Sequence, residues 1–308
     1  MDRYTPADIL ALKLVPGAGN VSLRLILTCL RQQKSRLRSL LGKPLPELLP
    51  LFPCGQERLA ELIHACDARM RKRAVSLLQT LEKHAIIPIL SGTPAYPAAL
   101  ETHLGKNAPL LFFAKGNLAL LYQEAIGIVG TRMPSQKGTR ITQECARMFA
   151  EHGIPIVSGG ARGVDTFAHE AALEAGGDTL IVLPQGILTY SPSSRYAAAL
   201  SDGKLLLISE FSPDAEWQTH AAVTRNATIS ALARMILVIE PHSVNGSLRT
   251  ARHALEQGKS VFYHGLGTAA QPLARHPNTV PLSPVNSQIL LSTFHQPGAS
   301  FPNQSCLF

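Results

Sequence analysis

The spacing of hydrophobic residues changes near residue 85. Upstream, apolar side chains recur at helical intervals within 9–12, 21–30 and 59–81, as in helices that bury one face. Downstream, short continuous apolar runs alternate with helical patterns as far as Gly267. Continuous apolar strands separated by helices are typical of a parallel sheet that is covered on both faces. The pattern therefore predicts a small all-helical domain over 1–84 and an α/β domain over 85–267.

The α/β domain is predicted to alternate strands with helices. Strands are expected at 86–90, 110–114, 125–129, 154–158, 179–183, 205–209, 235–240 and 260–263. Helices are expected at 135–152, 165–175, 193–202, 224–234 and 247–257. Residues 268–308 are rich in proline, which disfavours regular elements, and are predicted to form a C-terminal tail. The predicted fold class is α/β, with a doubly wound, mostly parallel sheet that follows the helical domain.

Charge is distributed unevenly along the 308 residues. Positions 1–120 hold 16 Lys+Arg against 8 Asp+Glu, whereas the remainder holds 13 of each. The excess includes two clusters: Arg31, Lys34, Arg36 and Arg38, and Arg69, Arg71, Lys72 and Arg73. Such clusters suit a polyanion such as nucleic acid, since bound phosphates release counterions. Two solvated helix faces would show the same pattern, so both interpretations stay open.

Composition excludes several classes of protein. With 45% hydrophobic and 16% charged residues, the chain can bury a core and is not disordered. No apolar run approaches the roughly 18 residues that span a bilayer, and the first residues lack a secretory pattern. The five cysteines are scattered, with neither a C-x-x-C pair nor histidine at metal-binding spacing. We therefore expect a cytoplasmic protein with no membrane contact, metal or cofactor.

A glycine-containing turn at 15–20 joins the first two predicted helices. This arrangement is that of a helix-hairpin-helix, whose turn can offer backbone N–H groups to a DNA phosphate. An ordinary corner between two helices has the same pattern. The sequence does not distinguish the two.

Two strand-to-helix turns in the α/β domain are rich in glycine. The first contains Gly130, Thr131 and Arg132, and the second runs from Ser158 to Asp165. Glycines let the backbone approach an oxyanion, and arginine offers a bidentate fork. Because ligands bind at the carboxyl ends of parallel strands, the turns predict a phosphate site there. Glycines that serve only tight turns and packing are the alternative.

Familiar nucleotide motifs do not fit these turns. Gly127 and Gly130 lack the spacing of a dinucleotide fingerprint, and the next strand ends in Ser158 rather than in an acid. A Walker A loop fails because His253 stands where its first glycine belongs, and a G-x-S-x-G elbow is absent. Asp165 and His169, four residues apart, read as a helix cap and its neighbour rather than as a catalytic dyad. The predicted site therefore binds phosphate without cleaving it, and we expect no enzyme.

The two turns belong to a longer series of motifs. In chain order these are Gly127-Ile128-Val129-Gly130-Thr131-Arg132, Ser158-Gly159-Gly160-Ala161-Arg162-Gly163-Val164-Asp165, Leu207-Ile208-Ser209-Glu210-Phe211, Arg225-Asn226 and Gly246-Ser247-Leu248-Arg249-Thr250-Ala251. Over residues 94 to about 263 the sequence resembles the DprA/Smf (DNA processing protein A) family. The helical N-terminal part resembles that family's N-terminal domain. The resemblance implies an extended Rossmann-like domain that binds single-stranded DNA and assists RecA loading in natural transformation and recombination.

The resemblance also implies which residues contact DNA. The family's two phosphate-binding turns correspond here to Gly130, Thr131 and Arg132, and to Ser158, Gly159, Gly160 and Arg162. Arg225 and Asn226 match the core of its R-N-R element, and Gly246 and Ser247 match its S-G-S turn. Backbone N–H groups and arginines hold a sugar–phosphate path without reading its sequence.

The sequence departs from the family pattern at several points. Ala227 replaces the second arginine of R-N-R, Ala222-Val223 replaces a Phe-Pro pair, and a C-terminal winged-helix domain is not expected. Losing one phosphate-facing arginine should weaken DNA binding and lower the salt slope by about one unit. The chain is thus expected to be a divergent member.

Three hypotheses follow. The first is a sequence-independent single-stranded DNA-binding protein with RecA as partner; the family also implies a homodimer. The second is a nucleotide-binding sensor or nucleoside-phosphate hydrolase of a related Rossmann-like family, although the P-G-G-x-G-T-x-x-E run of such hydrolases is absent. The third is a DNA-binding component of a mobile-element or defence locus.

Overall fold

The computed structural model describes residues 4–241, 246–265, 271–282 and 285–296. The chain divides into two compact units. The first comprises Met1–Ala114, Gln185–Thr189 and Ser209–Glu216, and the second comprises Lys115–Pro184, Tyr190–Ile208 and Trp217–Phe308. Because these units interleave along the chain, the domain limits expected at residues 84 and 267 stay a prediction.

The first unit is built mainly of helices, as the apolar spacing predicts. They are α1 (Pro6–Lys13), α2 (Asn20–Gln32), α3 (Leu45–Leu48), α4 (Glu57–Ala65), α5 (Ala68–Lys83) and α6 (Ala98–Leu104), with short 3-10 helices η1 (Leu37–Ser39), η2 (Leu49–Leu51) and η3 (Gly105–Asn107). A capping box starts α1, since Asp8 N–H donates to Thr5 Oγ1 and Thr5 N–H donates to Asp8 Oδ2. Helix α6 was not predicted, because seven residues are too few to display a helical period.

Two strands complete this unit. Strand β1 (Ile87–Leu90) pairs antiparallel with β2 (Leu111–Gly116), and Leu90 lies opposite Leu111. The turn between α1 and α2 uses Gly17 at φ +83°, in the left-handed region. The geometry of this turn suits a corner as well as a phosphate contact, so both interpretations stand.

The second unit contains a sheet of parallel strands. Its strands are β3 (Ala125–Gly130), β4 (Ile156–Ser158), β5 (Thr179–Val182), β6 (Leu205–Ser209), β7 (Ala233–Ile239), β8 (Val261–His264) and β9 (Thr279–Pro281). Their order across the sheet is β6-β5-β4-β3-β7-β8-β9. From β3 the chain builds outward to one edge and then returns to place β7 on the other side of β3. The strand order therefore reverses between β3 and β7, where such sheets form a crevice.

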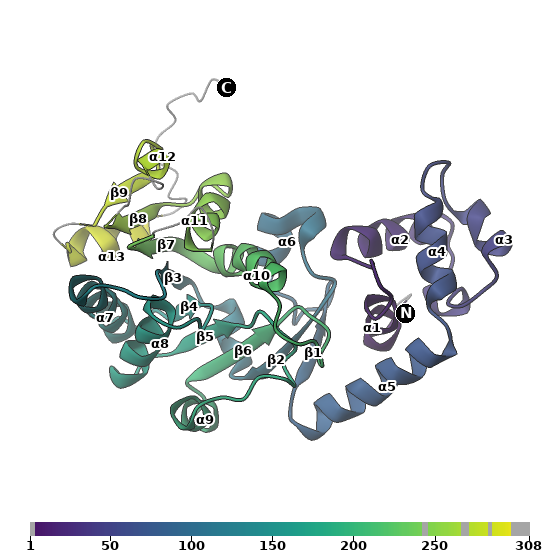
Figure 1. Ribbon diagram of the computed structural model, residues 1–308, viewed down its shortest axis with the longest axis horizontal. Coiled ribbons are helices and arrows are strands. Elements are labelled where there is room, and N and C mark those ends of the chain that lie inside the picture. The colour runs from purple at the N-terminus through teal and green to yellow at the C-terminus, as the bar shows by residue number, and fades with distance from the viewer. Residues whose placement is uncertain (1–3, 242–245, 266–270, 283–284, 297–308) are drawn as a thin grey trace. The chain divides into compact units, whose positions relative to one another are not determined.

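Helices cover both faces of this sheet (Figure 1). They are η4 (Leu118–Tyr122), α7 (Gln136–Glu151), α8 (Val164–Glu174), α9 (Ser194–Ser201), α10 (Thr219–Leu232), α11 (Ser247–Glu256), α12 (Gln271–Ala274) and α13 (Ser287–His295). On one face Ile126 and Ile128 of β3 pack against Phe149 of α7 and Ala168 of α8 in a buried core. Helices α10 and α11 contact β3 and β7 from the other face. The predicted doubly wound α/β fold is confirmed.

The structure departs from the prediction after Gly267. Strand β9 extends the sheet by pairing in parallel with β8, and α13 adds Leu290 and Phe294 to the core. The prolines of this segment obscured a short strand and a nine-residue helix. Within the described residues, no helix has the length and apolar character needed to cross a bilayer.

Candidate functional site

A hollow of about 360 Å³ lies at the carboxyl ends of β3 and β7. The two strands end level, since Gly130 pairs with Ile239. The residues that line the hollow are Val129, Gly130, Thr131, Arg132, Ala161, Asp165, Trp217, Thr219, Ala222, Val223, Arg225, Asn226, Gly246, Ser247 and Thr250. Seven of the eleven residues expected at the site are thus brought together: Gly130, Thr131, Arg132, Arg225, Asn226, Gly246 and Ser247.

The turn after β3 is fixed by backbone hydrogen bonds on both sides. Thr131 N–H donates to the carbonyl of Ile239 at 3.1 Å, and Val164 N–H donates to the carbonyl of Thr131 at 3.1 Å. A Cβ at Gly130 would lie 2.3 Å from the Ile239 oxygen, so close packing alone requires glycine there. Arg132 is exposed, and among the described residues no acid pairs with it. The turn therefore holds the exposed Arg132 guanidinium on a backbone that hydrogen bonds fix on both sides.

Gly163, which the sequence analysis did not assign to the site, allows the two glycine-rich turns to touch. Its φ is +90°, and a Cβ there would lie 2.5 Å from the Thr131 carbonyl oxygen and 2.6 Å from the Arg132 carbonyl carbon. Any other residue would push the turns apart. In the sequence, the position of this glycine between the glycine-rich turn and the predicted helix was the available signal.

The turn after β4 is largely occupied with internal hydrogen bonds. Ser158 is fully buried, and its Oγ donates to the Ile128 carbonyl at 2.6 Å. Asp165 Oδ2 accepts from Gly159 N–H at 3.2 Å and from Ala161 N–H at 3.4 Å. Burial raises the pKa of Asp165, while the nearby Arg225 guanidinium opposes that rise. This carboxyl shapes the turn.

Four of the expected site residues are absent from this lining: Ser158, Gly159, Gly160 and Arg162. Gly160 adopts φ +67°, as a tight turn requires. Arg162 is exposed, and within the described ranges it forms no ion pair. Of these four, Arg162 is the one whose side chain points a charge into solvent.

Arg225 lies beneath the hollow and is 5% exposed. Its Nη1 donates to the carbonyl oxygens of Gly159, at 2.6 Å, and Val182. These oxygens lie at the carboxyl ends of β4 and β5, so the guanidinium braces the floor of the site. The resemblance implied a phosphate contact for Arg225, and the geometry adds a structural role.

Asn226 holds the start of α11. Its Nδ2 donates to the Gly246 carbonyl at 3.3 Å, and Gly246 adopts φ +71° just before the helix. No described side chain caps α11. The first N–H groups of a helix lack intrahelical partners, and the helix dipole adds positive potential there. Gly246 and Ser247 line the same hollow as Thr131 and Arg132, so the chemistry of this lining suits an anion.

Trp217 is the only tryptophan of the chain and lines the same hollow. Its side chain is 48% exposed, just before α10. An indole beside a cationic groove is a surface on which a nucleobase can stack. Trp217 was not among the predicted site residues, although a lone tryptophan in a polar stretch was a visible signal.

Asp165 and His169, the possible dyad, are both buried, and His169 Nε2 has no hydrogen-bond partner among the described residues. His169 is fully buried, its Nδ1 lies 2.6 Å from Thr179 Oγ1, and burial lowers its pKa to about 3. Glu210 belongs to the first unit, where its Oε2 accepts from Asn20 Nδ2 at 3.4 Å. Across the described part of the chain, no group of acids, histidines and cysteines is arranged to hold a metal ion.

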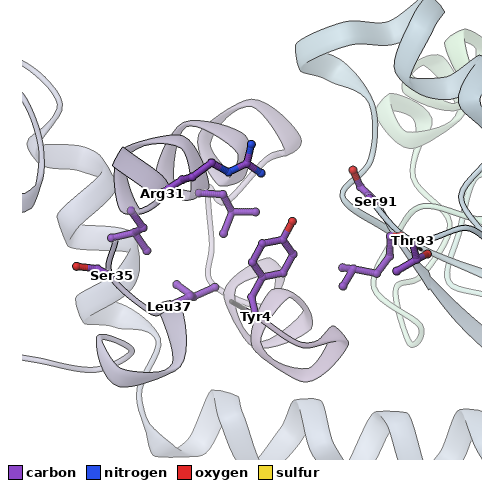
Figure 2. Close-up of a pocket in the computed structure, with 10 residues that line it drawn as sticks. Tyr4, Arg31, Ser35, Leu37, Ser91 and Thr93 are labelled. Atoms are coloured by element: carbon purple, nitrogen blue, oxygen red, sulfur yellow. Dashed lines mark hydrogen bonds between the residues drawn. The ribbon is translucent and has the colours of Figure 1, made fainter. Parts of the chain in front are cut away.

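A separate hollow of about 260 Å³ lies within the first unit. Figure 2 shows Tyr4 and Arg31 projecting toward the loop that carries Ser91 and Thr93. Ser91 Oγ donates to Glu101 Oε1 at 2.5 Å, and Thr93 Oγ1 donates to a backbone carbonyl at 2.7 Å. Both loop hydroxyls therefore have hydrogen-bond partners within the first unit.

Comparisons with known proteins point to one family. The family model for DNA recombination-mediator protein A matches residues 88–278. The chain is 38% identical over 196 residues to protein Smf of Escherichia coli, covering 62% of this chain and 51% of that protein. It is 36% identical over 158 residues to the DNA processing protein DprA of Streptococcus pneumoniae, covering 51% of this chain and 55% of that protein. The chain thus spans about half the length of the curated relatives it matches.

Solved structures agree with this match. DprA from Streptococcus pneumoniae superposes with a TM-score of 0.76 at 25% identity, covering 95% of this chain and 99% of that one. DprA from Helicobacter pylori, whose structure describes a single-stranded DNA binding mode, gives a TM-score of 0.57 at 24% identity, covering 68% and 94%. The latter likeness shows the fold.

Proposed function

Because the chain belongs to the DNA recombination-mediator protein A family, also called DprA/Smf, we propose that it binds single-stranded DNA without sequence preference. The strand's phosphates lie in the hollow at the ends of β3 and β7. The protein holds the strand and leaves its bonds intact. The single-stranded DNA bound by the Helicobacter pylori relative supports this choice of ligand.

One observation carries the proposal: the start of α11, which no described side chain caps, lines the same hollow as Thr131 and Arg132. Helix N–H groups, a hydroxyl and a guanidinium together complement a phosphodiester. None of these groups reads a base edge, so binding is independent of sequence.

The site residues divide into two roles. Arg132 and Arg162 are exposed and supply the charges that meet phosphates. Buried Ser158, Arg225 and Asn226 hold the turns and the start of α11 in place. Since Ala227 stands where the family has a second arginine, fewer cations meet the strand, and the salt slope is correspondingly lower.

The protein's role in the cell is the finer part of the proposal. Family membership supports action on DNA taken up in natural transformation, with RecA as the protein that receives the bound strand. A homodimer that presents two such hollows would bind one strand at two points and gain avidity.

Substitution of the two exposed arginines tests the proposal. Arg132→Ala with Arg162→Ala should weaken binding of labelled oligo(dT), measured by fluorescence anisotropy, while Arg140→Ala with Arg147→Ala on α7 should not. Wild-type protein should prefer oligo(dT) to a duplex of equal length. Equal affinity for both forms, or unchanged binding in the site variant, contradicts the proposal. Release of free base from nucleoside monophosphates would favour the hydrolase alternative instead.

A further inference from the structure

A cationic hollow of about 680 Å³ also lies in the first unit, between α1, η1 and α5. It is lined by Thr5, Ala7, Asp8, Arg38, Ala68, Arg71, Lys72, Val75, Ser76 and Gln79. Arg38 comes from the first basic cluster of the sequence, and Arg71 and Lys72 come from the second. The fold therefore brings members of two distant clusters to one concave surface.

These three cations are available to a ligand. All three side chains are exposed, and the ion pairs found among the described residues include none of them. The next residue on α5 behaves differently, because Arg73 pairs with Asp214 at 2.6 Å. Cations that protein acids do not neutralise attract an external anion.

Among the described residues that line the hollow, the one acid is Asp8, and it already has hydrogen-bond partners. Asp8 accepts from the backbone N–H and the hydroxyl of Thr5, at 2.9 and 2.8 Å, in the capping box of α1. Its charge therefore serves the helix start, where the dipole favours an anion. The three cations outnumber this acid, so the described lining has a net positive charge. Ser76 and Gln79 also line the hollow and can donate hydrogen bonds.

We infer that this hollow binds the phosphate backbone of nucleic acid, as a site additional to the one at β3 and β7. Three cations in one open hollow exceed what a single monoanion needs, whereas successive phosphates of a polynucleotide meet all of them. The choice of nucleic acid among polyanions rests on the proposed function. This assigns the N-terminal charge excess a local role.

Both clusters also contain cations that do not line the hollow. Arg36 and Arg69 are exposed members of the same clusters and are absent from the lining described. Neutralising them removes the same net charge from the same unit. A difference between the two pairs therefore measures contact in the hollow rather than the protein's overall charge.

The test uses the full chain and two matched double variants: Arg38→Gln with Lys72→Gln in the hollow, and Arg36→Gln with Arg69→Gln outside it. Binding of oligo(dT) and of a duplex is measured by anisotropy over a series of salt concentrations. The hollow variant should lower the slope of log K against log salt by about 1.4, at about 0.7 per phosphate contact on a single strand. The outside variant should change it far less. The two DNA arms identify which form the hollow binds.

Several outcomes overturn the inference: an unchanged slope in the hollow variant, an equal change in both variants, or loss of binding to anionic lipid vesicles with DNA binding intact. Thermal melts check folding, and Arg38→Lys with Lys72→Arg should keep the wild-type slope. Failure of this inference can be distinguished from failure of the proposed function. If the proposed function is wrong, Arg132→Ala with Arg162→Ala does not change binding of the same oligo(dT).

Discussion

Arg225 Nη1 donates to the Gly159 carbonyl at 2.6 Å, and a Cβ at residue 159 would lie 2.2 Å from the same nitrogen. The glycine thus leaves the space in which a buried guanidinium ties together the ends of β4 and β5. The resemblance assigns Gly159 to a phosphate-binding turn, but in this structure the glycine is required because the Arg225 side chain packs against it. This contact links the stability of the fold to the shape of the site.

Gly159→Ala should displace the Arg225 guanidinium from its carbonyl partners. A buried charge that loses its hydrogen bonds costs stability, by about 2 kcal/mol or more. Urea denaturation measures the loss. Gly19→Ala is the control, because nothing lies within 4 Å of a Cβ there. Equal stability of Gly159→Ala and wild type would show that the guanidinium is not held as described.

Asn226→Ala should weaken DNA binding by loosening the start of α11. The lost hydrogen bond to Gly246 is worth only about 1 kcal/mol of stability, so the fold persists. Asn117→Ala is a matched control, since Asn117 also donates to a backbone carbonyl, that of Gly203 at 2.9 Å. Anisotropy with oligo(dT) should show weaker binding for Asn226→Ala alone. Equal affinities of the two variants would contradict the role assigned to α11.

His169 should make the protein sensitive to acid. Burial lowers its pKa to about 3 in the folded state, so as pH falls through the unfolded value the unfolded chain takes up a proton that the folded protein excludes. Stability is therefore lost below a pH of about 6.5, amounting to roughly 2 to 3 kcal/mol by about pH 4.5. Urea denaturation at several pH values in this range should show that the free energy of unfolding depends less on pH in His169→Gln than in the wild type. Parallel profiles would mean that His169 is not protected from protonation.

Much of the fold could be predicted because buried parallel strands are continuous apolar runs. The run at 205–209 became β6 with the same bounds. Helix α10 begins at Thr219 rather than at 224, because its apolar residues are spread around the helix and form no stripe that would mark its start. Strand β9 and α13 were missed because proline-rich sequence disguises short elements whose burial depends on the finished sheet.

The candidate site was harder to predict in detail. Glycine spacing placed Gly130 and Gly246 at strand and helix ends, where local sequence determines the backbone. The burial of Arg225 depends on carbonyls 66 and 43 residues away in the chain. The local sequence carries no sign of those partners, so a buried arginine and an exposed one look alike.

The central claim is that single-stranded DNA occupies the hollow at β3 and β7, and Trp217 reports on that hollow directly. As the only tryptophan, half exposed and part of the lining, it gives an intrinsic fluorescence signal specific to this site. Titration with oligo(dT) should quench that fluorescence in step with the anisotropy change, and Arg132→Ala should shift both curves together to higher DNA concentration. Binding that raises the anisotropy while the Trp217 emission stays constant would place the DNA elsewhere and contradict the account.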